Sequence, residues 1–427
     1  MHVAFFNRSY YPDNTATGQL LTDLCEDLVR DHGCRVSVVT GPPLMPTAQV
    51  AQGRGIVTRD RRHGVEIHRV RGSRFDKQRF AGRATNYLTY FTNACWAGLR
   101  LDRPDVVVAL TDPPIIGLAA WLAAKRFGAP LVMSFQDLFP EVTALLPDFH
   151  SDTINNLLQR TNRFLVKRAA RNIALGETMR QRLIENKGAP AETTTIIPSW
   201  ADTTAISPGP KKNAFSIAHG LADKFVVMYS GNIGLSQSLD TVIDAAVGLK
   251  DLSDLQVVFQ GEGVKKSALA ARAASLGLTN VTFLPFASRD ALSESFATAD
   301  VFIVPLQRGL AGYIVPSKLY GILAAGRPYV AAVESTCEVA ALTRLHGSGL
   351  LAEPDDAADL AAQVRRFYSD RMMTAGCGER ARAAALSFDR RLQVTRYMDV
   401  FNAVRPDARA AGSPIAAQER SDAQTRP

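Results

Sequence analysis

The stretch FVVMYSGNIGLSQSLDTVIDAA, residues 225–246, carries three structural signals in succession. It begins with a run of large apolar and β-branched residues, which is typical of a strand buried on both faces. Gly231 and Gly234 follow at once, and apolar residues then return at helical spacing at Leu239, Val242 and Ile243. This order predicts a strand, a glycine turn and a helix, the repeating unit of a parallel sheet.

The same pattern extends over most of the chain. We predict strands at 2–7, 35–41, 65–70, 105–110, 130–135, 172–176 and 193–200, and again at 225–231, 255–263, 281–286, 300–306, 328–333 and 347–354. Between the two series, the segment from Pro198 to Lys224 is rich in Pro, Gly, Ala and Lys. The sequence therefore predicts an α/β fold with two doubly wound domains facing each other across a cleft. We place them at 1–200 and 224–387, with a linker at 201–223. The segment 405–427 lacks periodicity and large apolar residues, and we predict a disordered tail.

Composition limits the class of protein. Hydrophobic residues make up 46% of the chain and charged residues 21%, which is typical of a globular protein. The five cysteines show no Cys-x-x-Cys or disulfide framework, and the chain starts directly with a strand-like HVAFFN. The most apolar stretch, 106–124, is interrupted by Asp112-Pro113-Pro114. We therefore expect a cytoplasmic protein whose membrane contact, if it has any, is peripheral.

Several predicted strand-to-helix turns suit an anionic ligand. Thr15-Ala16-Thr17-Gly18 follows the first strand, Gly231 and Asn232 follow the first strand of the second domain, and Gly261-Glu262-Gly263 follows the next. Backbone N–H groups in such turns can contact phosphate, although an ordinary Thr cap explains the first turn equally well. No Gly-x-Gly-x-x-Gly fingerprint is present, so NAD is a remote alternative.

A polar cluster follows the predicted strand 130–135. Gln136, Asp137 and Glu141 lie there, and a carboxylate at a strand end can orient a hydroxyl or accept its proton. The alternative is that Asp137 caps the following segment. No histidine falls at a comparable strand end, which argues against imidazole catalysis, and no metal-like cluster is visible, so we predict metal-independent chemistry.

A single lysine stands at the entrance of a short helix. In GYIVPSKLYGILAAGRPYVAA, residues 312–332, the apolar spacing predicts a helix from Leu319 to Ala325, and Gly326 ends it. Pro316, Ser317 and Lys318 precede it. Lys318 either supplies charge to an anion in the cleft or points into solvent, as most lysines do.

A basic segment lies in the first half. Residues 54–83 hold ten Arg or Lys against three acidic residues, and helix 84–101 follows with Tyr87, Tyr90, Phe91 and Trp96. Basic residues beside aromatic ones suit an anionic membrane surface. The aromatic residues can equally be core, Phe91 more so than Trp96. Nucleic acid is a third interpretation, which no binding motif supports.

These motifs together resemble a known family. YSGNIGLSQSLDTVIDAA, VFQGEGVKKSAL, VTFLPFASRDALSESFATADVFIVPLQ and VPSKLYGILAAGRP, with SFQDLFPEV and IIPSWADTTAISP upstream, are similar to family-four retaining glycosyltransferases. The likeness spans residues 1–400 and is most specific over 225–335. It is greatest to the subgroup for colanic acid, exopolysaccharide and surface-antigen biosynthesis.

The resemblance implies the GT-B architecture, two facing Rossmann-like domains. The acceptor would bind the first domain and the nucleotide-sugar the second. A C-terminal helix, here 388–404, would cross back to the first domain. Within this architecture we expect catalytic roles for Gln136, Asp137 and Lys318. We expect donor binding by Thr17, Gly18, Gly231, Asn232, Gln237, Gly261, Glu262, Phe286, Pro316, Ser317 and Lys318.

The chain also departs from the family pattern. The usual pair of glutamates falls on Tyr313 and Gly321, the usual Arg and Lys fall on Asn232 and Gln237, and the usual His falls on Gln136. These departures leave the ribose and diphosphate contacts open.

The expected function is metal-independent transfer, with retention, of a sugar from a GDP- or UDP-linked donor, with no further cofactor. The expected acceptor is a polyprenyl-diphosphate-linked glycan or another saccharide in exopolysaccharide, capsule or O-antigen synthesis, at the inner face of the cytoplasmic membrane. The alternatives are a nucleotide-sugar 2-epimerase of the same fold and a catalytically silent partner that binds nucleotide-sugar.

Overall fold

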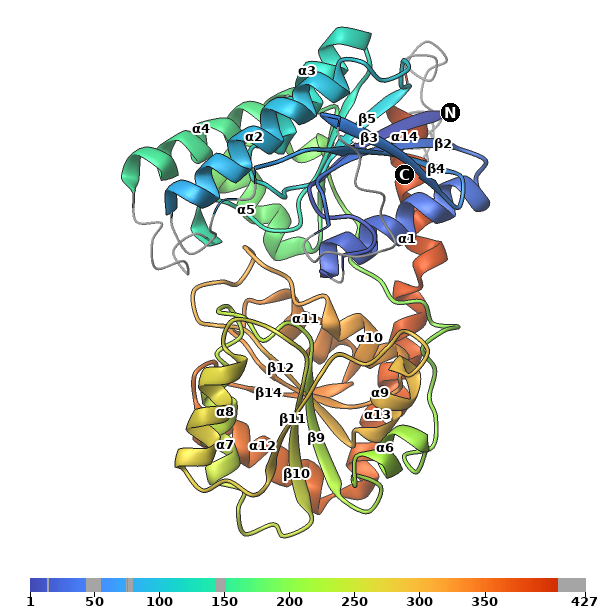
Figure 1. Ribbon diagram of the computed structural model, residues 1–427. Helices are drawn as coiled ribbons and strands as arrows, with labels where there is room; N and C mark the ends of the chain where they lie inside the picture. The colour runs from blue at the N-terminus through green and yellow to red at the C-terminus, as the bar shows by residue number, and fades with distance from the viewer. Residues whose placement is uncertain (14, 44–54, 74, 76–79, 143–150, 406–427) are drawn as a thin grey trace, which may run out of the picture.

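The computed structural model describes residues 1–13, 15–43, 55–73, 75, 80–142 and 151–405, and Figure 1 shows them as two α/β domains stacked on each other. In the described part of the first domain the sheet has the order β3-β4-β2-β1-β5-β6-β7-β8. Its strands are β1 (His2–Phe6), β2 (Arg35–Thr40), β3 (Val57–Arg62), β4 (Val65–Val70), β5 (Val106–Ala109), β6 (Leu131–Ser134), β7 (Arg171–Ala174) and β8 (Thr194–Ile196).

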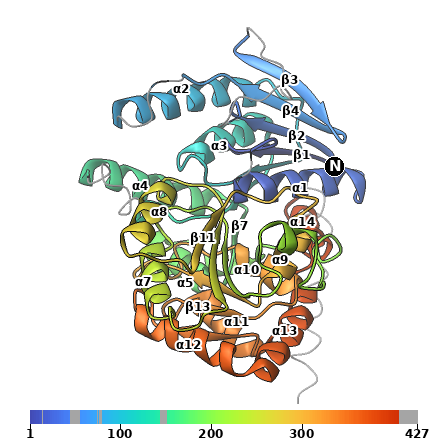
Figure 2. The same ribbon diagram turned by 60° about the horizontal axis from the view of Figure 1, so that its bottom comes forward.

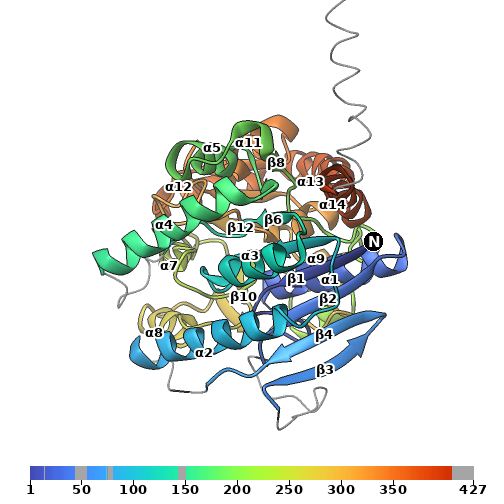
Figure 3. The same ribbon diagram turned by 90° about the horizontal axis from the view of Figure 1, so that it is seen from above.

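Helices cover both faces of this sheet. Helices α2 (Phe80–Gly98), α3 (Ile116–Phe127), α4 (Asp152–Arg168) and α5 (Glu177–Lys187) pack on one face, while α1 (Ala16–Arg30) and α14 (Arg390–Val404) pack on the other. Figure 3 shows α2, α3 and α4 across one side of the domain. Because both faces are covered, the central strands β1 and β5 are fully buried, as their continuous apolar runs predict.

One strand departs from the predicted parallel arrangement. Strand β3 pairs antiparallel with β4 through a turn at His63 and Gly64, both with positive φ (44° and 84°). The sequence analysis missed β3 because its residues, VTRDRR, are mostly charged. They lie at the edge of the sheet, where one face remains in water.

The second domain has the sheet order β11-β10-β9-β12-β13-β14 within the described residues, and all neighbours are parallel. Its strands are β9 (Phe225–Ser230), β10 (Leu255–Gln260), β11 (Val281–Leu284), β12 (Val301–Pro305), β13 (Tyr329–Ala332) and β14 (Gly349–Ala352).

Alternate residues of β9 face opposite cores, as the two-residue period of a strand requires. Val226 and Met228 pack on one side, with α9 (Leu292–Thr298), α10 (Lys318–Ala324) and α13 (Arg371–Ala385). Val227 and Tyr229 pack on the other, with α7 (Leu239–Val247), α8 (Lys266–Ser275) and α12 (Ala357–Ser369). Figure 2 shows these helices around the sheet. Helices α6 (Ala214–Ala218) and α11 (Glu338–His346) complete the domain.

Helix α14 follows the second domain in sequence and packs against the first (Figure 1). The Tyr397 hydroxyl lies 2.8 Å from Ser134 Oγ, the Phe401 ring meets Phe5, and the Arg390 guanidinium donates to Asp27 at 2.5 Å. The predicted disordered tail lies outside the described residues, apart from Arg405.

The two domains also touch where α5 meets α11. The Glu338 carboxylate accepts a hydrogen bond from the Glu177 backbone N–H at 2.9 Å, at the first residue of α5. A negative charge is favourable at a helix N-terminus. Gly176 permits this approach, because a Cβ there would lie 2.3 Å from Glu338 Cδ.

Candidate functional site

The second sheet reverses its strand order between β9 and β12, and doubly wound sheets bind ligands at the carboxyl ends of such a pair. Gly231 follows β9 and Gly261 follows β10, with φ of 141° and 152°. A Cβ on Gly261 would lie 1.9 Å from the carbonyl oxygen of Gly231. Both the backbone angle and the close approach therefore require glycine at 261.

Lys318 lies beside this glycine turn. It is the first residue of α10, and its Nζ is 3.2 Å from the position that a Cβ on Gly231 would take. The Nζ stands 3.7 Å from the centroid of the Tyr229 ring and is buried without a hydrogen-bond partner among the described residues. Burial lowers the pKa of Lys318 to about 7. The structure thus holds an unpaired amine at the strand ends, where an anion would favour its charged form.

Two other predicted donor-binding residues adjoin the same turn. Phe286 is 41% exposed, and its Cε1 is 3.4 Å from the position of a Cβ on Gly261. The Gln237 side chain lies against Gly234, and its Oε1 is buried without a partner among the described residues. Asn232 accepts from the Tyr229 hydroxyl through its backbone oxygen and remains exposed. The structure therefore brings Gly231, Asn232, Gln237, Gly261, Phe286 and Lys318 to one end of the sheet.

Other predicted contacts have local partners instead. The Glu262 carboxylate accepts from Lys266 Nζ at 2.7 Å, and the Gly18 N–H donates to Thr15 Oγ1 at 3.2 Å. The Thr cap is therefore present at the start of α1, and it uses the N–H of Gly18. Thr17 is partly exposed in the same turn. Pro316 and Ser317 form the turn into α10, and Ser317 makes no side-chain cap hydrogen bond.

Asp137 lies on the facing edge of the first domain. Its backbone N–H and that of Gln136 approach Thr111 Oγ1 at 3.3 and 3.2 Å. Asp137 forms an isolated β-bridge with Ile314 of the second domain. The backbone N–H of the neighbouring Leu138 donates to the backbone carbonyl oxygen of Tyr313 at 2.9 Å. The Asp137 turn thus adjoins the loop that leads to Lys318. Burial, followed by repulsion from Asp112, raises the pKa of Asp137 to about 6.

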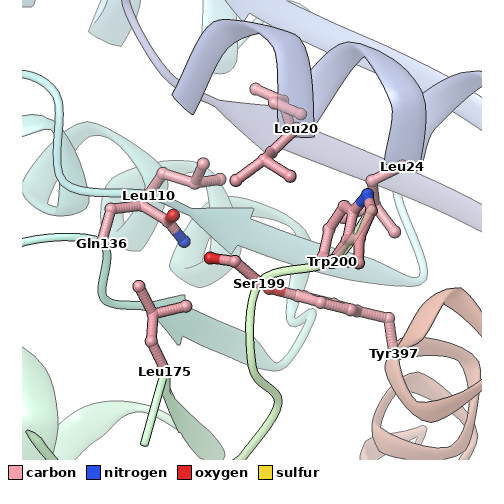
Figure 4. A pocket seen from close by; sticks show the side chains of 9 residues that line it. Leu20, Leu24, Leu110, Gln136, Leu175, Ser199, Trp200 and Tyr397 are labelled. Atoms are coloured by element: carbon pink, nitrogen blue, oxygen red, sulfur yellow. The ribbon is translucent and has the colours of Figure 1, made fainter. Parts of the chain in front are cut away.

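The Gln136 side chain lies in a hollow between α1, the segment after β8 that carries Ser199 and Trp200, and α14 (Figure 4). Its Nε2 approaches Ser134 Oγ at 3.3 Å, and Ser199, Trp200 and Tyr397 line the same hollow. Gln136 thus lines this hollow, whereas the Asp137 turn meets Ile314 of the second domain, so the two residues need not act on one group.

The positions of the missing glutamates have other contacts. A Cβ on Gly321 would lie 3.0 Å from Phe296 Cε2. The Tyr313 hydroxyl accepts from Asn186 Nδ2 at 3.2 Å, and its ring faces Arg182. Gly321 therefore packs closely within the second domain, while Tyr313 contacts the first domain.

Sequence reasoning missed three groups near these turns. Tyr229 lies against the Lys318 amine, Thr111 holds the Asp137 turn, and Glu334 Oε2 accepts from the N–H groups of Gly309 and Ala311 at 2.9 and 3.3 Å. Thr111 and Glu334 both stand just after strands, at β5 and β13, and that position was the available signal.

Glu141 was predicted to belong to the Asp137 cluster. Its carboxylate instead pairs with the fully buried Lys187 ammonium at 2.8 Å. Glu141 therefore anchors the turn rather than facing a ligand. No three His, Cys, Asp or Glu side chains gather into a metal-binding group in the described ranges, and metal independence stays a prediction.

Comparisons with known proteins agree with this arrangement. A glycosyl transferase 4-like domain matches residues 16–200, and a glycosyl transferases group 1 domain matches residues 211–384. The chain is 27% identical to the putative colanic acid biosynthesis glycosyl transferase WcaI of Escherichia coli, over 86% of this chain and 92% of WcaI. It is 29% identical to the probable glycosyltransferase WbjE of Pseudomonas aeruginosa, over 62% and 66% of the two chains.

Solved structures share the fold. HepE of Anabaena in complex with UDP and glucose superposes with a TM-score of 0.72 at 18% identity, over 94% of this chain and all of HepE. WaaG, a glycosyltransferase involved in lipopolysaccharide biosynthesis, gives 0.68 at 18% identity, over 93% and 99%. The fold, the paired domains and the relatives agree, and the chain belongs to the family-four glycosyltransferases of the GT-B architecture, in the group related to colanic acid and surface-antigen biosynthesis.

Proposed function

We propose that the protein transfers a sugar, with retention and without a metal, from a nucleoside-diphosphate sugar to a lipid-linked or saccharide acceptor. The observation that carries this proposal is the buried, unpaired Lys318 amine beside the Gly231 turn. Departure of a nucleoside diphosphate places negative charge on the leaving oxygen. Lys318, once protonated, would stabilise that charge, and no acceptor among the described residues hydrogen-bonds to its Nζ and competes with the ligand.

The glycine turns complete the donor side of the proposal. Gly231 carries no Cβ, and the position that one would take lies 3.2 Å from Lys318 Nζ, so a diphosphate held by that amine can approach the Gly231 backbone closely. Gly261 lets the ends of β9 and β10 come close enough to form this turn. The exposed ring of Phe286 offers a face for a nucleotide base. The UDP bound in HepE supports a diphosphate donor, because the two proteins share the fold. Both UDP- and GDP-linked sugars fit this chemistry.

Asp137 carries the acceptor side. Its carboxylate stands at the edge of the first domain, against the loop leading to Lys318. A carboxylate there would orient the acceptor hydroxyl and accept its hydrogen bond. Because the pKa of Asp137 is raised to about 6, this role needs a pH above 6.

Asp137→Asn should lower the rate of sugar transfer about 100-fold or more, the range for loss of a positioned acid or base. The wild-type rate should rise with pH through about 6, as the carboxylate ionises, and the variant should lack this rise. The raised pKa means that the fold favours the protonated form, so the variant should not be less stable at pH 7. Asp290→Asn, at an exposed position of the second domain, is the control. Equal rates in wild type and Asp137→Asn would remove Asp137 from the mechanism.

The proposed activity is tested by incubating purified protein with UDP- and GDP-linked sugars, with EDTA present, with and without a bacterial membrane-lipid extract. Release of nucleoside diphosphate that requires the extract, with the sugar recovered in lipid, supports the transferase. A change of the donor sugar without release supports the 2-epimerase. Nucleotide binding without turnover in any arm supports a silent partner and contradicts the proposal.

We also propose peripheral contact with an anionic membrane through the first domain. Leu88 and Trp96 of α2 are exposed, as is Leu99 directly after the helix, and Arg100 stacks on Trp96 at 4.0 Å. No described helix has the length and apolar character needed to cross a bilayer. The turnover assay repeated in anionic and in zwitterionic vesicles addresses this contact.

Not all of the predicted basic segment is available for the membrane. Arg62 pairs with Glu26 at 2.8 Å, and the Arg69 side chain is buried and donates to the Tyr11 oxygen. Tyr90, in the predicted aromatic helix, belongs to the core. The exposed part comprises Arg59, Arg61 and Arg71, while residues 54, 74 and 76–79 lie outside the described part of the chain.

A further inference from the structure

The first sheet has a switch point of its own. Its strand order reverses between β1 and β5, so a ligand crevice is expected outside the carboxyl ends of these two strands. The loops that leave them are joined there, because the Arg8 N–H donates to the Asp112 oxygen at 2.7 Å. Arg8 and Asp112 therefore stand at the place in the first domain that corresponds to Gly231 in the second.

The Arg8 guanidinium has few partners for its five N–H donors. Its Nε lies 3.5 Å from Asp112 Oδ1, its Cζ stands 5.5 Å from the centroid of the Tyr87 ring, and its side chain is 23% exposed. Nε is buried and has no hydrogen-bond partner among the described residues. An arginine fork left open in this way suits bidentate recognition of a phosphate or carboxylate.

A second unsatisfied donor lies beside it. Tyr90 of α2 is only 1% exposed, and its hydroxyl has no partner among the described residues. Arg8 Cγ and Tyr90 Cε2 both lie close to Gly41, 3.0 and 3.6 Å from the position that a Cβ there would take. Buried donors are nearly always paired in folded proteins, so two unpaired donors at one switch point need an explanation.

We propose that Arg8 and Tyr90 bind an oxyanion, a phosphate or a carboxylate, carried by the acceptor substrate. This proposal rests on the proposed transferase function and specifies the chemistry of its acceptor. A phosphate would come from a lipid-diphosphate carrier and a carboxylate from an acidic sugar, and both present the paired oxygens that the fork recognises.

Asp112 positions the Arg8 guanidinium and does not occupy the edge of it that would bind the anion. Its Oδ2 accepts from Ser9 Oγ at 2.6 Å, and its Oδ1 faces the Nε side of Arg8. The remaining edge of the fork stays open. Asp112 also neutralises part of the charge, so binding should depend on hydrogen-bond geometry more than on net charge. Thr111, the residue before Asp112, accepts a hydrogen bond from the Asp137 backbone N–H at 3.3 Å, which places the anion site near the proposed acceptor hydroxyl.

The experiment measures thermal stabilisation by inorganic phosphate, glucuronate and methyl glucoside. It uses Lys318→Met as the parent protein, so that phosphate does not bind in the second domain. Phosphate or glucuronate should stabilise the parent, and R8Q should bind it at least tenfold more weakly, with Arg8→Lys intermediate because it keeps the charge without the fork. Y90F should also bind more weakly, and its own folding should not suffer, because it removes only an unpaired hydroxyl.

Stabilisation by phosphate alone identifies a lipid-diphosphate source, and stabilisation by glucuronate alone identifies an acidic sugar. The proposal is overturned if R8Q and Y90F bind the anions as the parent does, if neither anion stabilises the parent, or if only methyl glucoside does. Binding of UDP and GDP is measured separately in R8Q that retains Lys318. If R8Q loses anion binding and still binds nucleotide normally, the effect concerns the acceptor site alone. If the wild-type protein binds no nucleotide, the result counts against the proposed function instead.

Discussion

Lys318→Met is expected to abolish nucleoside-diphosphate release and to weaken donor binding, yet to make the free protein more stable. The side chain of methionine follows that of lysine as far as Cε and carries no charge, so most of the packing beside Gly231 is retained. A buried hydrogen bond to a charged group contributes roughly 1.5–3 kcal/mol, so donor binding should weaken about 10- to 100-fold. The effect on turnover should be larger, because charge increases on the leaving oxygen in the transition state.

The stability effect has a definite sign. Burial holds the pKa of Lys318 at about 7, below its ordinary 10.5, so the unfolded chain binds more protons between these two pH values. The free wild-type protein should therefore gain stability as pH rises from 7 to about 10. Lys318→Met lacks this dependence, and its advantage, on the order of 1–3 kcal/mol, should be greatest at and below pH 7 and disappear toward pH 10.

Donor binding should follow the opposite trend. An anionic ligand binds the protonated amine, so wild-type affinity should fall by up to about tenfold per pH unit above 7, until the pKa of the bound state is reached. Calorimetric titration of UDP and GDP at pH 6.5, 7.5 and 8.5 measures this, and thermal melts at the same pH values measure stability. Lys266→Met, a nearby lysine that pairs with Glu262 on the surface, is the control and should change neither. A pH-independent affinity in the wild type would mean that Lys318 does not contact the donor.

The fold could be predicted from the sequence because its central strands are unambiguous. Strand β9 is buried on both faces, and its continuous apolar run and following glycines have few other interpretations. Strand β3 was missed because an edge strand half in water does not require apolar residues. Local sequence signals therefore identify strands with apolar runs, including the edge strands β8, β11 and β14, and they fail at the charged edge strand β3.

The site could be predicted only in part. Lys318, Gly231 and Gly261 are visible in sequence because glycine and an isolated lysine at strand ends are unusual. The sequence does not show that these residues lie together. Lys318 meets the Tyr229 ring, and Gly261 meets the Gly231 carbonyl, only in the folded protein. Arg8 was overlooked because its significance depends on a hydroxyl from α2 that no spacing connects to it. Gln136 and Asp137 were grouped because they are adjacent, although Gln136 lines the hollow beside Tyr397 and the Asp137 turn meets Ile314.

Gly261→Ala should be strongly destabilising, because among the described glycines Gly261 is the one at which an added Cβ would come closest to another atom. The new Cβ would lie 1.9 Å from the Gly231 carbonyl oxygen, which is backbone and cannot rotate away, and the φ of 152° is unfavourable for alanine as well. Separating the ends of β9 and β10 would break the hydrogen bond from the Gly231 N–H to the Gln260 oxygen, 2.9 Å long. It would also move Gly231 away from the Lys318 amine. We expect a loss of stability of about 3 kcal/mol or more and no measurable donor binding.

Gly277→Ala separates the two causes of this effect. Gly277 also has a positive φ, 60°, but a Cβ there would meet no atom within 4 Å. The Gly277→Ala variant should therefore lose only about 1 kcal/mol of its free energy of unfolding, from backbone strain, and should keep full donor affinity. Urea unfolding and nucleotide titration of both variants test the comparison. If Gly261→Ala behaves like Gly277→Ala, the close approach of the two strand ends is not needed for binding, and the diphosphate must contact another part of the second domain.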